Sequence, residues 1–249
     1  MSREQGAVAV LLLSSVALHG GRCWLTHSKQ RKTGTTQRWG GSIADFFYFV
    51  GLPYFAIVFG LLSAQKLGLK GLEYFSLMRL SPPVSAVSFL SEVWRATTLM
   101  ALAWLPDLSW FIFPGLLVLL IWSGTLTSLA HAEAVKLPAK LTGRDLLYYG
   151  LHWAFYWGIF WLLTGDPFFG VLLGTGLAAA ELKVEQIFLP GQDGRLIVTM
   201  LTLILMAMTF YYSANLWLVW LMQIIMIWLA QRISHKFDPL PTFVQPNAT

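Results

Sequence analysis

The sequence has a single cysteine and few charged residues. Because Cys23 is the only cysteine among 249 residues, an internal disulfide and a thiolate metal cluster are both excluded. Only 12% of the residues are charged, about half of the roughly 25% share that is usual in soluble domains. A chain of this length with 56% hydrophobic residues cannot hide its apolar surface from water, so part of its solvent is lipid.

The apolar stretches are continuous rather than alternating, which predicts helices and not a transmembrane β-barrel. We therefore predict an all-α polytopic integral membrane protein, a helical bundle with about seven transmembrane helices (six to eight). The lipid bilayer is the expected partner, and a net charge of +5 gives no indication of nucleic acid. The expected spans are 43–64, 84–105, 109–130, 147–163, 168–189, 195–212 and 213–231.

The chain divides into an N-terminal part, a helical membrane domain and a short tail. The N-terminal hydrophobic segment, 6–18, is too short to span unaided, and it could span, anchor or be cleaved. The basic residues of 22–38 predict a solvated arm. Near 65–82, leucines mix with basic residues, which is typical of an interfacial amphipathic segment. The three parts are 1–42, 43–235 and 236–249.

Loop composition gives an expected topology. Gly51–Pro53 predicts a kink or break, so 43–64 either spans once or forms a re-entrant hairpin. Short hinges predict antiparallel helical hairpins at 106–108, 164–167 and 190–194. Lysine and arginine gather in three connections, which predicts that these connections and the C-terminus are cytoplasmic. The connections are 65–82, 131–146 and the tail from Arg232.

Three ionisable residues near the end of 168–189 are the strongest candidates for a site. On a helix, Glu181 and Glu185 continue a stripe of small residues, whereas Lys183 points nearly opposite. We expect this stripe to pack closely against another helix, so both carboxylates face protein. An ionisable group at membrane depth is a functional hypothesis; the alternative is a helix already leaving the membrane. The predicted packing residues are Gly170, Gly174 and Ala178.

Other polar residues have open roles. His152 lies among aromatic residues and could be a structural histidine, a metal ligand, a pigment ligand or a general base. His131, at a predicted helix end, is a second candidate cofactor ligand. Glu92 and Arg95 are three residues apart, which predicts an intramembrane ion pair; alternatively, Arg95 holds Glu181 or a substrate anion. Polar intramembrane roles are predicted for Asn215, as a helix cap, and for Gln223, as an interhelical hydrogen-bonding group.

The common catalytic motifs are missing. The sequence contains no H-E-x-x-H, G-x-S-x-G or Walker loop. Of five histidines, only His152 lies clearly within a predicted span. A three-histidine metal site within the membrane is therefore not available from one chain, and no metal site and no firm cofactor are predicted.

The order of several segments resembles the CAAX-protease and bacteriocin-processing membrane family (CPBP, or Abi). The segments are "FVGLPYFAIVFGLLSAQKLGLKGLEYF", "RDLLYYGLHWAFYW", "DPFFGVLLGTGLAAAELK" and "NLWLVWLMQ". The resemblance covers about half the chain and implies a helical core with an intramembrane site of paired glutamates and later histidines. The E-E-x-x-x-R box is missing, with only Asp145 near its place, and Gln223 stands where a late histidine is expected. The resemblance thus implies a divergent, non-proteolytic member in a bacterial or organellar inner membrane.

Three functional hypotheses follow, and whether the protein is an enzyme is left open. The first is a non-catalytic scaffold or accessory subunit of a membrane complex, with other membrane subunits as partners. The second is an intramembrane hydrolase whose nonstandard site comprises Glu181, Glu185 and His152. The third is a pigment- or haem-binding subunit that uses His152 or His131 as an axial ligand.

Overall fold

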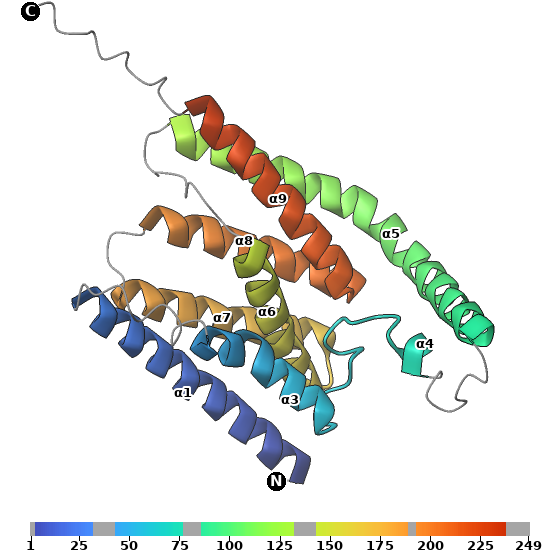
Figure 1. The fold of residues 1–249 in the computed structure, drawn as a ribbon. Helices are drawn as coiled ribbons and strands as arrows, with labels where there is room; N and C mark the ends of the chain where they lie inside the picture. The colour runs from blue at the N-terminus through green and yellow to red at the C-terminus, as the bar shows by residue number, and fades with distance from the viewer. Residues whose placement is uncertain (1–2, 32–42, 77–85, 132–142, 189–192, 238–249) are drawn as a thin grey trace, which may run out of the picture.

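The computed structural model describes residues 3–31, 43–76, 86–131, 143–188 and 193–237. Within these ranges the chain forms helices and turns but no β-strand (Figure 1). The elements are α1 (Arg3–Arg31), the π-helix η2 (Phe47–Gly51), α3 (Leu52–Val58), α4 (Glu73–Ser76), α5 (Ala86–His131), α6 (Gly143–Thr164), α7 (Pro167–Phe188), α8 (Asp193–Ser213) and α9 (Leu216–Phe237).

By length and composition, five of the described helices can cross a membrane. They are Gly6–Trp24 of α1, Phe111–Ser128 of α5, Pro167–Phe188, Leu196–Ser213 and Leu216–Ile233. This confirms the prediction of a polytopic helical membrane protein. The predicted number of about seven spans is corrected, because the 84–105 and 147–163 segments and the shorter apolar helix Ile43–Val58 are not among the five.

Helix α6 lies at the centre of the bundle although it is not among the five candidate spans. It contacts η2, α3, α7 and α9, and Figure 1 shows it in the middle of the other helices. Its middle carries Trp153, Phe155, Tyr156 and Trp157, all buried. These large rings explain why α6 is central and why it is not among the candidate spans. Tyrosine and tryptophan supply packing area, but they also carry polar groups that need hydrogen-bond partners from other protein segments.

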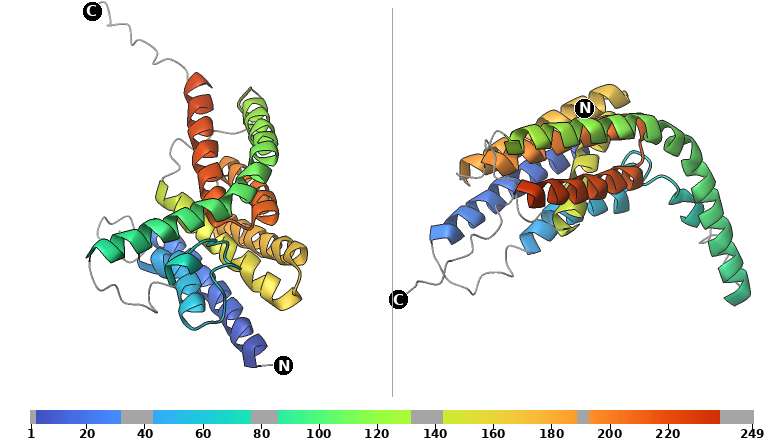
Figure 2. Two further views of the ribbon diagram at one scale, coloured as in Figure 1. Left: turned by 90° about the vertical axis from the view of Figure 1, so that its right-hand side faces the viewer. Right: turned by 90° about the horizontal axis from the view of Figure 1, so that it is seen from above.

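Helix α1 corrects the expectation for the N-terminus. The helix has 29 residues and continues through Arg22 to Arg31, so the first part of the predicted solvated arm is helical. Arg22 is mostly buried rather than solvated. Residues 32–42 lie outside the described part. Because α1 packs against α7, η2 and α3, it belongs to the helical bundle (Figure 2).

Helix α5 corrects the predicted hairpin at 106–108. One helix of 46 residues runs through this position, with Pro106 and Pro114 inside it. A proline removes one backbone hydrogen bond, yet membrane helices tolerate it by bending. Figure 2 shows the resulting curvature, which leaves the first part of α5 projecting from the bundle.

The segment around Gly51–Pro53 is neither a break nor a single span. The π-helix η2 leads directly into α3, and Pro53 follows the wider π turn, so the chain stays helical through the proline. The helix ends at Val58, too early to cross a bilayer, which needs about 20 residues.

The following turns place part of 65–82, the predicted interfacial segment, against the bundle, and its interfacial setting stays a prediction. Leu62 and Leu67 are buried in the core, and the Gly68 carbonyl accepts a hydrogen bond from the Leu216 N–H at 2.7 Å. Gly68 has φ 76°, and a Cβ there would lie 2.5 Å from the Phe210 ring. Only glycine fits this close approach. Residues 77–85 lie outside the described part.

A buried polar contact ties these turns to α5 and α9. Lys70 Nζ donates to both carboxylate oxygens of Asp107, at 2.8 and 2.9 Å. The Asn215 side chain donates to Asp107 Oδ2 at 3.0 Å, and its own oxygen accepts from the Trp217 N–H at 3.1 Å. Asn215 therefore caps α9 and also fixes the bend in α5.

Helices α6 and α7 form a close antiparallel hairpin through Gly165 and Asp166. A Cβ on Gly170 would lie 2.6 Å from the Trp161 backbone, and one on Gly174 would lie 2.8 Å from the Trp157 backbone nitrogen. Ala178 is buried on the same line. The small side chains let the two backbones touch, and this contact sets which face of α7 looks into the bundle.

We predict opposite effects for two alanine substitutions on α7. Gly174→Ala should lower the free energy of unfolding by about 1–3 kcal/mol, because the new methyl group meets α6 backbone. Gly176→Ala, where a Cβ would meet nothing within 4 Å, should be neutral or stabilising by about 0.5–1 kcal/mol. Unfolding followed by circular dichroism in one detergent measures both. Equal effects would contradict the close contact.

Candidate functional site

A cluster of polar side chains is buried where α1, η2, α6 and α7 meet. Its centre is the Glu181 carboxylate of α7, whose residue is 8% exposed, and the His152 imidazole of α6, 1% exposed. The packing of α6 against the small-residue stripe brings these two helices together. Glu181 lies on that stripe, one turn beyond Ala178, so its side chain points at α6.

The Glu181 carboxylate accepts two hydrogen bonds from tyrosines. Tyr48 Oη of η2 donates to Oε2 at 2.6 Å, and Tyr156 Oη of α6 donates to Oε1 at 2.5 Å. Ser15 Oγ of α1 lies 2.5 Å from the Tyr156 oxygen. Because the Tyr156 hydrogen is used on Glu181, Ser15 is the donor in that contact. Each carboxylate oxygen is thus held by a phenol from a different element.

His152 is close to the carboxylate but not firmly bonded to it. Its Nε2 lies 3.5 Å from Glu181 Oε2, longer than the usual 2.7–3.2 Å of an N–H···O hydrogen bond. Neither ring nitrogen makes a well-formed hydrogen bond within the described residues. The ring centroids of Tyr48 and Tyr156 lie 4.1 and 4.5 Å from that of His152. An imidazole at this distance can exchange a proton with the carboxylate after a small movement.

Helix α1 supplies a histidine and an arginine. His19 Nε2 lies 3.1 Å from the Glu181 backbone oxygen and 3.5 Å from Cys23 Sγ.

Arg22 donates to Glu185 Oε2 at 2.8 Å and lies 3.7 Å from Asp45. Its guanidinium also stacks over the Tyr48 and Phe49 rings, 5.1 and 4.9 Å from their centroids. Arg22 is therefore the cation that compensates Glu185 inside the bundle.

A small cavity opens at this cluster. It has a volume of about 10 Å³, and its lining includes Glu181, His152, Tyr48, Arg22 and Glu185. That volume is close to the lower limit for one water molecule. A reacting water would therefore touch the carboxylate and the imidazole at the same time.

The cluster does not fit a metal ion or a macrocycle. Among the described residues, no group of three histidine, cysteine, aspartate or glutamate side chains is placed to hold a metal. A haem or pigment needs an open face on its histidine ligand, whereas rings crowd His152 and the cavity is far too small. The side chain of His131, the last residue of α5, lies outside the described part.

The structure separates the other predicted residues from this cluster. Glu92 and Arg95 do form an ion pair at 2.8 Å, but their side chains are 43% and 64% exposed on α5. The pair lies before the candidate span Phe111–Ser128 of α5, and its intramembrane setting stays a prediction. Arg95 bonds Glu92 rather than Glu181. Asn215 lies at the start of α9, and Gln223 is buried against Gly150 of α6.

Sequence reasoning missed four members of the cluster. Tyr48, Tyr156 and His19 lie in aromatic or apolar runs that read as core or lipid-facing packing. Arg22 was assigned to the arm. One signal could have found the last two, because "HGGRC" places a histidine and an arginine three apart inside an apolar helix, where ionisable groups need partners.

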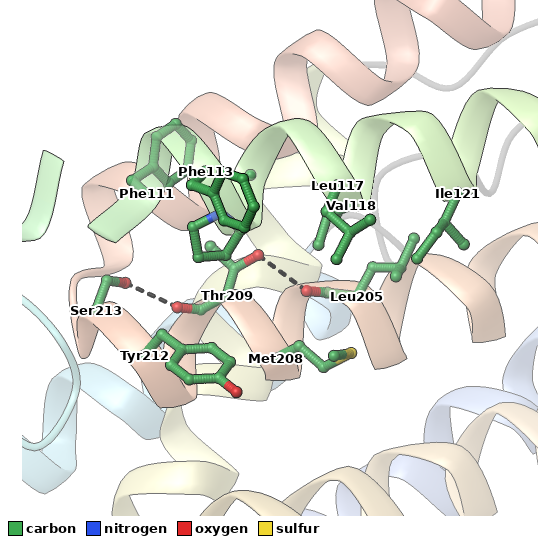
Figure 3. Close-up of a pocket in the computed structure, with 12 residues that line it drawn as sticks. Phe111, Phe113, Leu117, Val118, Ile121, Leu205, Met208, Thr209, Tyr212 and Ser213 are labelled. Atoms are coloured by element: carbon green, nitrogen blue, oxygen red, sulfur yellow. Dashed lines mark hydrogen bonds between the residues drawn. The ribbon is translucent and has the colours of Figure 1, made fainter. Parts of the chain in front are cut away.

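Two larger cavities flank α8 and have a different character. The groove between α5 and α8 holds about 310 Å³ and a second one between α7 and α8 about 320 Å³. Figure 3 shows the first, with apolar walls. Its Thr209 and Ser213 hydroxyls donate to carbonyls of their own helix, Leu205 and Thr209. These grooves are therefore mainly apolar surfaces without a reactive group.

Compared with protein-family models, with curated proteins and with solved structures, this chain matches none. The resemblance to the CAAX-protease and bacteriocin-processing family thus stays a prediction. What stands is an all-helical polytopic membrane protein with one buried cluster of a carboxylate, imidazoles, phenols and an arginine.

We predict that Tyr48→Phe weakens the cluster. The substitution removes the hydrogen donated to Glu181 Oε2, which should lower the free energy of unfolding by about 1–2 kcal/mol. Tyr54→Phe is the matched control, because Tyr54 is 62% exposed and should change stability by less than about 0.5 kcal/mol. Chemical unfolding in one detergent compares the two. If both variants match the wild type, the phenol does not hold the carboxylate.

Proposed function

We propose that this polytopic membrane protein is an intramembrane hydrolase in which Glu181 and His152 form the acid–base pair. The observation that carries the proposal is the geometry of the Glu181 carboxylate. Two phenols hold it, and an imidazole without a firm hydrogen bond lies 3.5 Å from the same oxygen that Tyr48 contacts. Catalytic hydrogen bonds are often long in a resting enzyme and tighten when substrate binds.

The chemistry follows from the groups present. The carboxylate, assisted by His152, takes a proton from a water molecule, and the water oxygen attacks the carbonyl carbon of an amide in a membrane-embedded chain. A C–O bond forms, the C–N bond breaks, and the proton passes to the leaving nitrogen. Tyr48 and Tyr156 donate their hydrogens to Glu181 and hold the base in place.

The cost of burying the cluster also supports this function. A carboxylate in a low-dielectric interior is expensive unless several donors surround it, so such groups persist in membranes mainly where they act. The cluster further combines glutamates from α7, an arginine from α1 and a histidine from α6. These are residue types of the resembled family's site, brought together here without the E-E-x-x-x-R box. We therefore propose hydrolytic chemistry where the resemblance alone predicts a non-proteolytic member.

Substitution of the base tests the proposal. The purified protein in lipid nanodiscs is incubated with a panel of single-pass membrane peptides in ¹⁸O-labelled water, and the products are read by mass spectrometry. Cleavage should place one ¹⁸O in the new carboxyl group, and Glu181→Gln should slow it by about a hundredfold or more. Glu92→Gln, which alters an exposed ion pair, is the control and should retain wild-type cleavage.

The proposal fails if Glu181→Gln cleaves every peptide at the wild-type rate. A folded variant is required for the comparison, so each protein is first shown to elute as the wild type does and to have the helix content of the wild type by circular dichroism. Glu181→Asp keeps the carboxylate but moves it, and should cleave more slowly than wild type yet faster than Glu181→Gln.

The role of a non-catalytic scaffold or accessory subunit is the second candidate. The two apolar grooves beside α8 support it, because grooves without reactive groups suit the packing of another membrane helix. Purification in a gentle detergent should then recover further membrane chains in fixed proportion. A monodisperse single chain would count against this role.

A further inference from the structure

Two adjacent glycines lie in the middle of α1, beside the polar cluster, without a packing reason. A Cβ on Gly20 or on Gly21 would meet nothing within 4 Å. Elsewhere in the bundle, Gly170 and Gly174 are required because a neighbouring backbone approaches closely. Gly20 and Gly21 are therefore not needed to let another segment approach α1. They give the backbone conformational freedom, which lowers the stability of the helix.

The glycines separate two sets of contacts to the cluster. Before them, Ser15 and His19 contact Tyr156 and the Glu181 backbone. After them, Arg22 bonds Glu185 and lines the cavity. Gly-Gly pairs are a recognised place for a helix to bend, so a bend here would move Arg22 without moving Ser15.

We propose that α1 bends at Gly20–Gly21 and that this motion lifts Arg22 from Glu185 and opens the cavity at Glu181 toward lipid. The role of this motion in substrate entry rests on the proposed function. The motion of the helix itself does not. A membrane-embedded segment would then enter from the bilayer plane, through the position that the second part of α1 vacates.

The contacts of Arg22 suit a closure that can be broken and remade. They include an ion pair of 2.8 Å with Glu185, a longer one of 3.7 Å with Asp45, and stacking over two rings. Arg22 is also close to Trp24, where the candidate span of α1 ends, and Glu185 is less than one turn from the end of α7. Both charged groups can therefore reach the headgroup region when they separate.

Cys23 is a native reporter of this motion. It is the single cysteine of the chain, it is buried, and it lies two residues beyond the glycines. A thiol reagent such as N-ethylmaleimide reacts only when the second part of α1 moves away from the bundle. The rate of labelling, measured by mass spectrometry on the full chain in nanodiscs, thus measures opening without any substrate.

The double variant Gly20→Ala/Gly21→Ala is the decisive test. Alanine favours a straight helix, so labelling of Cys23 should slow by about fivefold to thirtyfold. Gly124→Ala is the matched control, since Gly124 is also helical, with nothing within 4 Å of its Cβ, and it should label at the wild-type rate. Glu185→Gln weakens the closure and should speed labelling, whereas Glu92→Gln on the exposed pair should not.

The outcomes separate this inference from the proposed function. Equal labelling of the wild type and the Gly20→Ala/Gly21→Ala variant overturns the hinge, whatever the peptides show. Slower labelling of that variant with no cleavage of any peptide by the wild type keeps the hinge and removes the hydrolase. If cleavage occurs and falls together with labelling in the double variant, the hinge is also the route of the substrate.

Discussion

The structure depends on keeping one carboxylate, that of Glu181, satisfied inside a helical bundle. A carboxylate removed from water must regain its hydrogen bonds and a balancing charge from protein. The donors here come from η2 and α6, and the nearest imidazole comes from α6. Segments 133 residues apart in the chain are joined by one of these bonds. Satisfying Glu181 therefore specifies how the first and second halves of the chain meet.

Several features of the fold serve this requirement. The small-residue stripe of α7 lets α6 approach closely enough for Tyr156 to reach Glu181. The aromatic middle of α6 fills the centre of the bundle while offering polar groups at its edge. Helix α1 closes the cluster, and its Arg22 compensates the second carboxylate, Glu185. The same closure shields the site from lipid, so any reaction at Glu181 requires α1 to move away from the cluster.

Local patterns predicted part of this arrangement. The helical period alone placed Glu181 and Glu185 on one face with Gly170 and Gly174, because the position of a side chain around a helix depends only on its number in the chain. The pairing of Arg22 with Glu185, 163 residues away, depends on tertiary packing that one sequence does not encode visibly. The segment 106–108 was predicted to be a short hinge, but a long membrane helix absorbs the backbone donor missing at Pro106 by bending.

The coupling between Glu181 and Tyr156 tests the central claim most directly. A double-mutant cycle with Glu181→Gln and Tyr156→Phe, read from unfolding free energies in one detergent, isolates their interaction. The structure predicts an interaction energy of about 0.5–3 kcal/mol, because the two groups share a buried hydrogen bond. A cycle with the exposed Tyr54→Phe should be additive within about 0.5 kcal/mol. Additivity in the Tyr156 cycle as well would contradict the buried cluster and the site built on it.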